Sequence, residues 1–176
     1  FDAGSFFGIA TAAGSTGSVI LDNSSITADT IEIGAGGYLG GNNGTLIGSV
    51  VNHGTMNPGN SPGTLVIQGS YQAAAGSRLV LEVESDGQGG FKTDKLVFGG
   101  AVDLNGLDIE FKFLGSTDPV LFAQSGQFMI NTFLRSGSHG SGVLDSDAFA
   151  GVDFSASAAP GYDLDNFSFD AATGSN

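Results

Sequence analysis

Apolar residues in this chain recur in short runs, and glycine, asparagine or aspartate separates one run from the next. Three runs open with Gly-Thr and an apolar residue, at 44–46, 54–56 and 63–65, which are spacings of ten and nine residues. Gly17-Ser18 and Gly48-Ser49 open two similar runs. Glycine and asparagine adopt the positive φ angles that tight turns require. The pattern therefore predicts short strands joined by tight turns at a nearly constant interval.

Strands at a constant interval are typical of a solenoid, in which each coil stacks on the coil before it. One coil alone cannot bury its apolar side, so stacking supplies the core. We expect such coils over residues 1–75. An open end of the stack must be covered to prevent edge pairing.

The pattern changes after residue 75. Apolar residues alternate with charged ones over 79–84 and 107–113, and alternation with a period of two predicts strands with one buried face. Asn105-Gly106 lies between two apolar runs, which predicts a hairpin. No window shows an uninterrupted helical period. We therefore predict an all-β protein with an antiparallel β cap over 76–170, followed by a tail over 171–176.

Composition favours a protein that folds around a core. Hydrophobic residues make up 40% of the chain and charged residues 13%, about half the roughly 25% that is usual in globular domains. The fourteen phenylalanines are expected in that core. The net charge is −13, and the five basic residues all lie between positions 78 and 135. Phosphate groups are bound by clustered Lys and Arg, so nucleic acid and anionic lipid are poor partners.

Residues 57–65 read Asn-Pro-Gly-Asn-Ser-Pro-Gly-Thr-Leu and follow a Gly-Thr pair. This run closely resembles a segment in the C-terminal passenger region of autotransporter adhesins. The stretches 77–84, 93–97 and 102–107 fit the same family, whereas His53 stands where the family often has a second asparagine. The resemblance implies a right-handed parallel β-helix, displayed at the outer membrane of a Gram-negative cell in adhesion and virulence. It also implies that this autochaperone-like stretch nucleates folding of the passenger.

Residues 160–169 resemble the last strand before the sorting tail of PEP-CTERM proteins, which are exported and anchored in an exopolysaccharide matrix. Both resemblances imply a secreted or cell-surface location. No stretch approaches the roughly 20 apolar residues of a membrane helix, so we expect no membrane insertion by this segment.

Residues suited to catalysis are few. The chain has no cysteine and two histidines, His53 in a turn and His139 in a Gly-Ser-rich loop. Neither is supported by a Gly-x-Ser-x-Gly elbow. A glycosidase needs two held carboxylates, and over 15–70 the acids are Asp22, Asp29 and Glu32, with Tyr38 as the single aromatic residue. We therefore assign no catalytic residue and predict no enzyme; a polysaccharide-cleaving β-helix enzyme is the alternative.

Ca²⁺ is the ion that this composition could bind, because it needs only oxygen ligands. The pairs Asp145/Asp147 and Asp163/Asp165, and the Gly-rich stretch 86–90, are the places to look. Solvated carboxylates are the simpler interpretation, so we assign no metal ligand and no cofactor.

Two functions follow from these observations. The first is a structural or adhesive segment of a surface protein, whose partners are host or matrix glycans, proteins, or other copies of itself. The second is an extracellular-matrix module that binds Ca²⁺ or glycan.

Overall fold

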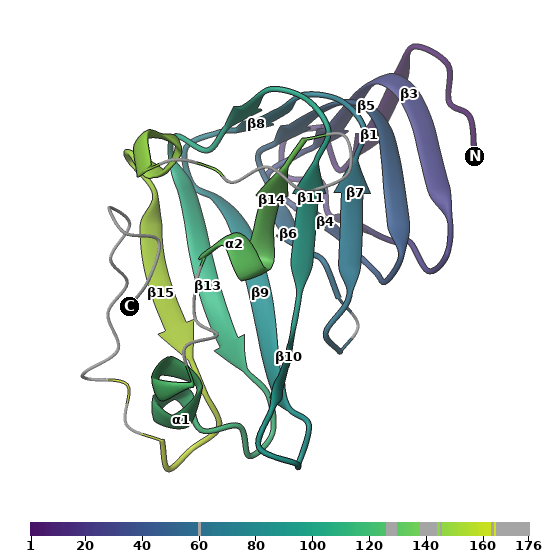
Figure 1. The fold of residues 1–176 in the computed structure, drawn as a ribbon. Coiled ribbons are helices and arrows are strands. Elements are labelled where there is room, and N and C mark those ends of the chain that lie inside the picture. The colour runs from purple at the N-terminus through teal and green to yellow at the C-terminus, as the bar shows by residue number, and fades with distance from the viewer. Residues whose placement is uncertain (60, 126–129, 138–143, 145, 163, 165–176) are drawn as a thin grey trace.

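The computed structural model describes residues 1–59, 61–125, 130–137, 144, 146–162 and 164. Strands make up 51% of the structure and helices 8%, which confirms the prediction of a mostly β protein. The strands form two sheets in which neighbouring strands run parallel, with one short exception among the described residues, in the second sheet. Figure 1 shows the two sheets facing each other across one interior.

The chain contributes strands alternately to the two sheets. Sheet A contains, in spatial order, β1 (Phe6–Ile9), β3 (Ser25–Ile33), β5 (Gly44–Asn52), β7 (Thr64–Ile67), β11 (Lys95–Phe98) and β14 (Leu134–Ser136). The short strands β8 (Tyr71–Ala73) and β12 (Val102–Asp103) extend sheet A beside the second half of β5. Sheet B contains β2 (Gly17–Ile20), β4 (Gly37–Gly40), β6 (Thr55–Asn57), β9 (Ser77–Ser85), β13 (Leu107–Phe113) and β15 (Asp153–Ser157).

The Gly-Thr pattern marks strands as predicted. The three pairs at 44, 54 and 63 open or directly precede β5, β6 and β7, which lie in sheets A, B and A. Two intervals of about ten residues therefore return the chain to the same sheet, and we call such a repeat, with one strand in each sheet, a coil. Gly17 opens β2 as expected. Gly48-Ser49 does not open a strand, because this pair lies inside β5 where the strand bends.

The predicted change to antiparallel pairing after residue 75 is wrong. β9 pairs in parallel with β6 and β13, and β13 pairs in parallel with β15. Within the described residues, only the short strand β10 (Phe91–Thr93) runs antiparallel, against β9. Alternation of apolar and polar residues indicates only that one face of a strand is exposed to solvent. A parallel sheet with a solvent-exposed outer face gives the same pattern as an antiparallel one. Both sheets continue across residue 75, since β11 also pairs with β7.

The predicted hairpin at Asn105-Gly106 is also wrong, although the turn exists. Gly106 has φ +82°, and the Leu107 N–H donates to the Leu104 carbonyl at 3.0 Å. The turn connects β12 in sheet A to β13 in sheet B, and each strand pairs with the strand one coil earlier, β8 and β9 respectively. A tight turn fixes only the change in chain direction. The pairing partner of each strand depends on which strand of the previous coil lies beside it.

Short helices appear where the sequence pattern predicts none. They are α1 (Pro119–Gln124), α2 (Ile130–Phe133) and the 3₁₀ helix η1 (Ser146–Phe149). Asp118 caps α1, because its carboxylate accepts the Val120 N–H at 2.8 Å and the Leu121 N–H at 3.3 Å. An aspartate followed by proline is a recognisable helix start, so this helix had a local signal. η1 and β15 (Asp153–Ser157) both lie within the range predicted as a cap. The predicted tail over 171–176, and residues 163 and 165–169 of the strand expected over 160–169, lie outside the described residues.

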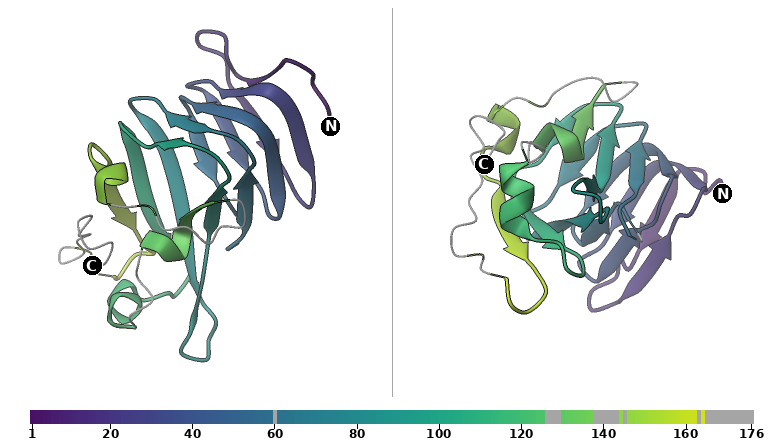
Figure 2. Two further views of the ribbon diagram at one scale, coloured as in Figure 1. Left: turned by 45° about the horizontal axis from the view of Figure 1, so that its top comes forward. Right: turned by 60° about the horizontal axis from the view of Figure 1, so that its bottom comes forward.

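Figure 2 shows the short green helices at the C-terminal end of the stack. Aromatic side chains of these helices and of neighbouring strands belong to the buried core. The Phe133 ring of α2 lies 5.1 Å from the Phe111 ring of β13, centroid to centroid, and Phe122 of α1 lies 5.0 Å from Phe91. Phe111, Phe122 and Phe133 are fully buried. The expectation of core phenylalanines holds here, whereas Phe1 and Phe6 at the N-terminal end are exposed.

A buried hydrogen bond between neighbouring coils gives a first prediction. The Asn52 amide donates from Nδ2 to the Tyr71 hydroxyl at 3.1 Å, while Asn52 Oδ1 accepts the Gly54 N–H at 3.0 Å. Tyr71→Phe leaves the Asn52 amide without an acceptor, so we expect the free energy of unfolding to fall by about 1–3 kcal/mol. Urea denaturation measures this, with Tyr162→Phe as the control, because the Tyr162 hydroxyl makes its hydrogen bond at the surface. Equal losses in the two variants would contradict the assignment.

Candidate functional site

Sheet A bends along a column of small residues. The register between β3 and β5 shifts between Thr27 and Thr30, at the level of Gly48. The strands approach so closely here that a Cβ on Gly48 would lie 1.8 Å from the Ala28 carbonyl oxygen. A Cβ on Gly69 would lie 2.1 Å from the Gly48 carbonyl oxygen, one coil further on. The bend therefore depends on glycine in successive coils.

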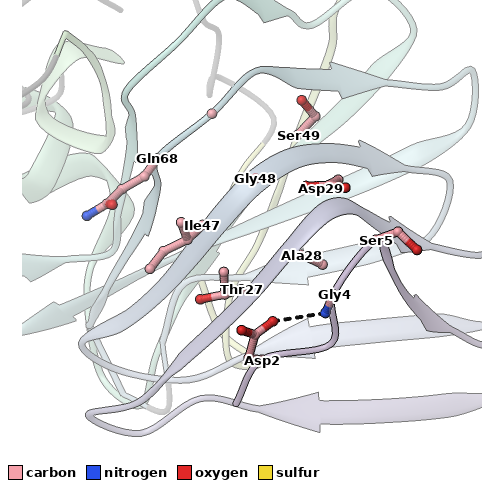
Figure 3. A pocket seen from close by; sticks show the side chains of 11 residues that line it. Asp2, Gly4, Ser5, Thr27, Ala28, Asp29, Ile47, Gly48, Ser49 and Gln68 are labelled. Atoms are coloured by element: carbon pink, nitrogen blue, oxygen red, sulfur yellow. Dashed lines mark hydrogen bonds between the residues drawn. The ribbon is translucent and has the colours of Figure 1, made fainter.

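A groove follows this bend on the outer face of sheet A. Its first part has a volume of about 710 Å³, and its walls carry the side chains of Asp2, Ser5, Thr27, Asp29, Ile47, Ser49 and Gln68 (Figure 3). Its second part, of about 390 Å³, is lined by Val66, Gln68, Val97, Gly99 and Gly137. Gln68 lines both parts, so they adjoin at this residue, and we call the two together the bend groove.

The bend groove is polar and carries negative charge at one end. The Asp2 carboxylate accepts the Gly4 N–H at 2.9 Å, and Asp29 lines the same part of the groove with an exposed side chain. Among the described residues that line the two parts, none is Lys or Arg. The groove therefore offers hydroxyl, amide and carboxylate groups to a partner that carries no negative charge of its own.

A second polar feature lies beside β9 of sheet B, around the buried side chain of Asp94. Asp94 Oδ1 accepts the Gly63 N–H and Oδ2 accepts the Glu82 N–H, both at 2.8 Å. The Asp94 N–H in turn donates to the Glu82 carbonyl at 2.9 Å. This carboxyl group therefore links the segment before β7 to β9.

Burial raises the pKa of Asp94 to about 7, and the nearby Glu82 carboxylate adds to the increase, while the two N–H donors and Lys112 oppose it. Lys112 Nζ lies 3.1 Å from Glu82 Oε1. Burial also raises the pKa of Tyr38, and the buried Asn57 Oδ1 has no hydrogen-bond partner. Gly59 and Gly63 lie against the Asp94 carboxyl group, so its contacts are structural ones within the fold.

The residues considered for catalysis do not form a site. His53 is an exposed turn residue whose N–H donates to the Ile33 carbonyl at 2.7 Å. Asp22 accepts the Asn42 N–H at 3.1 Å, Glu32 is half-buried on β3, and only Asp29 lines the bend groove. His139 lies outside the described residues.

The carboxylates considered as Ca²⁺ ligands either make other contacts, are exposed, or lie outside the described residues. Asp86 Oδ1 accepts the Gln88 and Gly90 N–H groups at 2.8 and 2.9 Å, and these bonds lower the pKa of Asp86. Its carboxylate therefore closes the tip of the β9–β10 hairpin. Asp147 is an exposed residue of η1, and Asp145, Asp163 and Asp165 lie outside the described residues. Across the part of the chain that is described, no three histidine or acidic side chains gather where they could hold a metal ion.

Sequence reasoning missed Asp2 and Gln68 in the bend groove and the buried role of Asp94. A signal for the bend was available in Gly48, Gly69 and Gly100, which follow one another in successive coils. No local pattern marks Gln68, because its place in the groove comes from the residues stacked on either side. None of the described helices is long and apolar enough to cross a bilayer. No family model, curated protein or solved structure matches the chain.

Proposed function

We propose that this chain is a non-catalytic structural segment of a secreted, surface-displayed bacterial β-protein, and that its two sheets are the walls of a right-handed parallel β-helix. Support comes from the alternation of strands between the sheets, with parallel pairing between successive coils. Connections between parallel strands of one sheet are right-handed in about 98% of known cases. The resemblance of residues 57–65 to autotransporter passengers supports the same architecture and an extracellular location.

The observation that carries this proposal is an uninterrupted column of buried side chains through successive coils. Leu39, Met56, Leu79 and Ile109 lie in register from β4 to β13, and each is fully buried. Such a column gains stability from every added coil. Because these side chains fill the interior, polar and charged groups lie on the outer faces. This arrangement suits a displayed binding surface better than an enclosed active site.

We further propose that the C-terminal elements cap the stack and nucleate its folding. The aromatic cluster around Phe111, Phe122 and Phe133 supports this, because it fills the end of the interior with α1 and α2. In this proposal the cap consists of short helices packed on parallel strands, in place of the antiparallel sheet expected from sequence.

Surface display tests the capping role. The chain is joined to an export signal and an outer-membrane β-barrel, and external protease is added to intact cells. We expect the wild type to resist cleavage and Phe133→Ala to be cleaved, because deleting a buried ring typically costs about 3–5 kcal/mol. Leu121→Ala is the matched control, since Leu121 lies on α1 and is 59% exposed. Equal resistance of Phe133→Ala and the control would contradict a cap.

The non-catalytic assignment is tested with a polysaccharide panel and an assay for new reducing ends. We expect no release above background from the wild type or from Asp22→Asn, Asp29→Asn and Glu32→Gln. Turnover that these substitutions abolish would establish the glycosidase alternative.

The same protein is titrated with millimolar Ca²⁺ while its melting temperature is followed. We expect no shift, since the Asp86 carboxylate is already bonded to its own hairpin. A rise of several degrees would favour the Ca²⁺-binding module.

A further inference from the structure

We propose that the bend groove binds a linear polysaccharide without acidic groups, with the sugar chain lying across the strands along the axis of the stack. This inference rests on the proposed function, since it assumes a displayed surface that binds without turnover. It assigns the partner of that surface to one chemical class and to one face of the molecule.

The groove runs across the strands, from one coil to the next. Thr27 pairs with Ile47, and the registers of the following strands place Gln68, Gly99 and Gly137 next in the same row. Both parts of the groove follow this row. Neighbouring strands in a sheet lie about 4.8 Å apart, which is close to the length of one sugar ring in a linear chain. Successive sugars would therefore meet successive coils.

The walls of the groove carry groups that suit a sugar. Thr27, Ser49 and Gln68 present hydroxyl and amide groups, which can both donate to and accept from sugar hydroxyls. Ile47 is 36% exposed between them and offers an apolar contact for the C–H face of a ring. In the second part Val66 and Val97 offer further apolar contacts, and Gly99 and Gly137 add no side chain.

Charge favours a sugar chain without acidic groups. Asp2 and Asp29 stand at one end of the groove, and the whole chain carries a net charge of −13. A uronic acid polymer would be repelled there, whereas hydroxyl groups or a protonated amino sugar would be accepted. The exposed Arg135 lies beside Val97 at the other end, so an acidic sugar could find a favourable contact only at that end.

An extended peptide is the competing partner, and the groove suits it less well. Peptides that bind sheets add a strand at a free edge and use backbone hydrogen bonds. The bend groove instead crosses strands that are already paired on both sides, such as β5 between β3 and β7. Their backbone groups are committed to the sheet, so recognition must come from side chains, as it does for sugars.

Isothermal titration calorimetry with three hexasaccharides tests the inference on the whole chain. The probes are cellohexaose, which is neutral, a chitosan hexamer, which is cationic, and an oligogalacturonate hexamer, which is anionic. We expect the first two to bind and the third to bind at least tenfold more weakly. Gln68→Ala should weaken binding about tenfold, which corresponds to about 1.4 kcal/mol. Gln72→Ala is the matched control, because Gln72 is exposed on β8 of the same sheet outside the groove.

Melting temperatures of both variants are compared with the wild type, so that a lost interaction is distinguished from a lost fold. The absence of binding to cellohexaose and chitosan, or equal effects of the two glutamine substitutions, would overturn the inference and leave the structural role intact. Release of new reducing ends from the bound sugar would instead overturn the non-catalytic function. Equal binding of the oligogalacturonate would show that charge does not select the partner, and would overturn the proposed class of partner.

Discussion

Replacing Gly48 by alanine is expected to lower the free energy of unfolding by about 4 kcal/mol or more, the range of the most damaging single substitutions. Two causes act together. The new Cβ would lie 1.8 Å from the Ala28 carbonyl oxygen, and Gly48 has φ +139°, which residues with a Cβ rarely adopt. For a chain of this size the melting temperature should fall by about 10 °C. Thermal and urea unfolding followed by circular dichroism measure the change.

Two further glycines separate these causes. Gly76 has φ +81° and open space around its Cβ position, so Gly76→Ala reports the backbone strain alone, about 1 kcal/mol. A Cβ on Gly17 of β2 would lie 3.7 Å from its nearest neighbour, the Ala10 Cβ, and Gly17 has no positive φ. Gly17→Ala should therefore change the free energy of unfolding by less than about 0.5 kcal/mol. A loss of stability in Gly48→Ala as small as that in Gly17→Ala would contradict the close approach of β3 and β5 at the bend.

The second large effect is expected from Asp94→Asn, as a change in how stability depends on pH. The folded protein holds the Asp94 proton up to a pKa of about 7, whereas the unfolded chain releases it near 3.8. Between these values the folded state binds more protons, so the free energy of unfolding decreases as the pH rises. The stabilisation lost over this window is at most about 4 kcal/mol. The amide introduced by Asp94→Asn has no proton to release, so that variant lacks this decrease.

The difference in stability between wild type and Asp94→Asn isolates the effect, because the other acidic residues are common to both proteins. At about pH 5 the variant should be less stable by about 1–3 kcal/mol, since an amide cannot accept both the Gly63 and the Glu82 N–H. By about pH 8 the difference should shrink or reverse. Asp153→Asn removes a charge from the exposed face of β15 and should retain the pH dependence of the wild type. A difference between wild type and Asp94→Asn that stays constant with pH would show that Asp94 is ionised in the folded protein.

The local pattern was enough to locate most strands. The alternation over 107–113 matches β13, in which Leu107, Ile109 and Phe111 are buried and Lys112 is exposed. The Gly-Thr pairs locate β5, β6 and β7 because tight turns and β-branched residues act over a few positions. Helix α1 was not predicted although Asp118-Pro119 marks its start, because a helix of six residues is too short to show a helical period.

Pairing could not be predicted in the same way. β12 and β13 are joined by a turn that is common in hairpins, yet their partners are β8 and β9 from the previous coil. The burial of Asp94 likewise depends on Gly59 and Gly63, which lie against its carboxyl group. These outcomes require contacts between residues in different coils, far apart along the chain, which no short window contains.

The sequence by itself determined that this chain forms short strands with one buried face, and that its surface is acidic, because both properties follow from neighbouring residues and composition. Only the tertiary structure decided that the strands pair in parallel throughout both sheets, with β10 as the exception among the described residues. It also decided that Thr27, Ile47 and Gln68 stand in one row along a groove. The physical reason is that stacking selects partners by register and burial across whole coils, whereas a pattern along the chain specifies only which side of each strand is apolar.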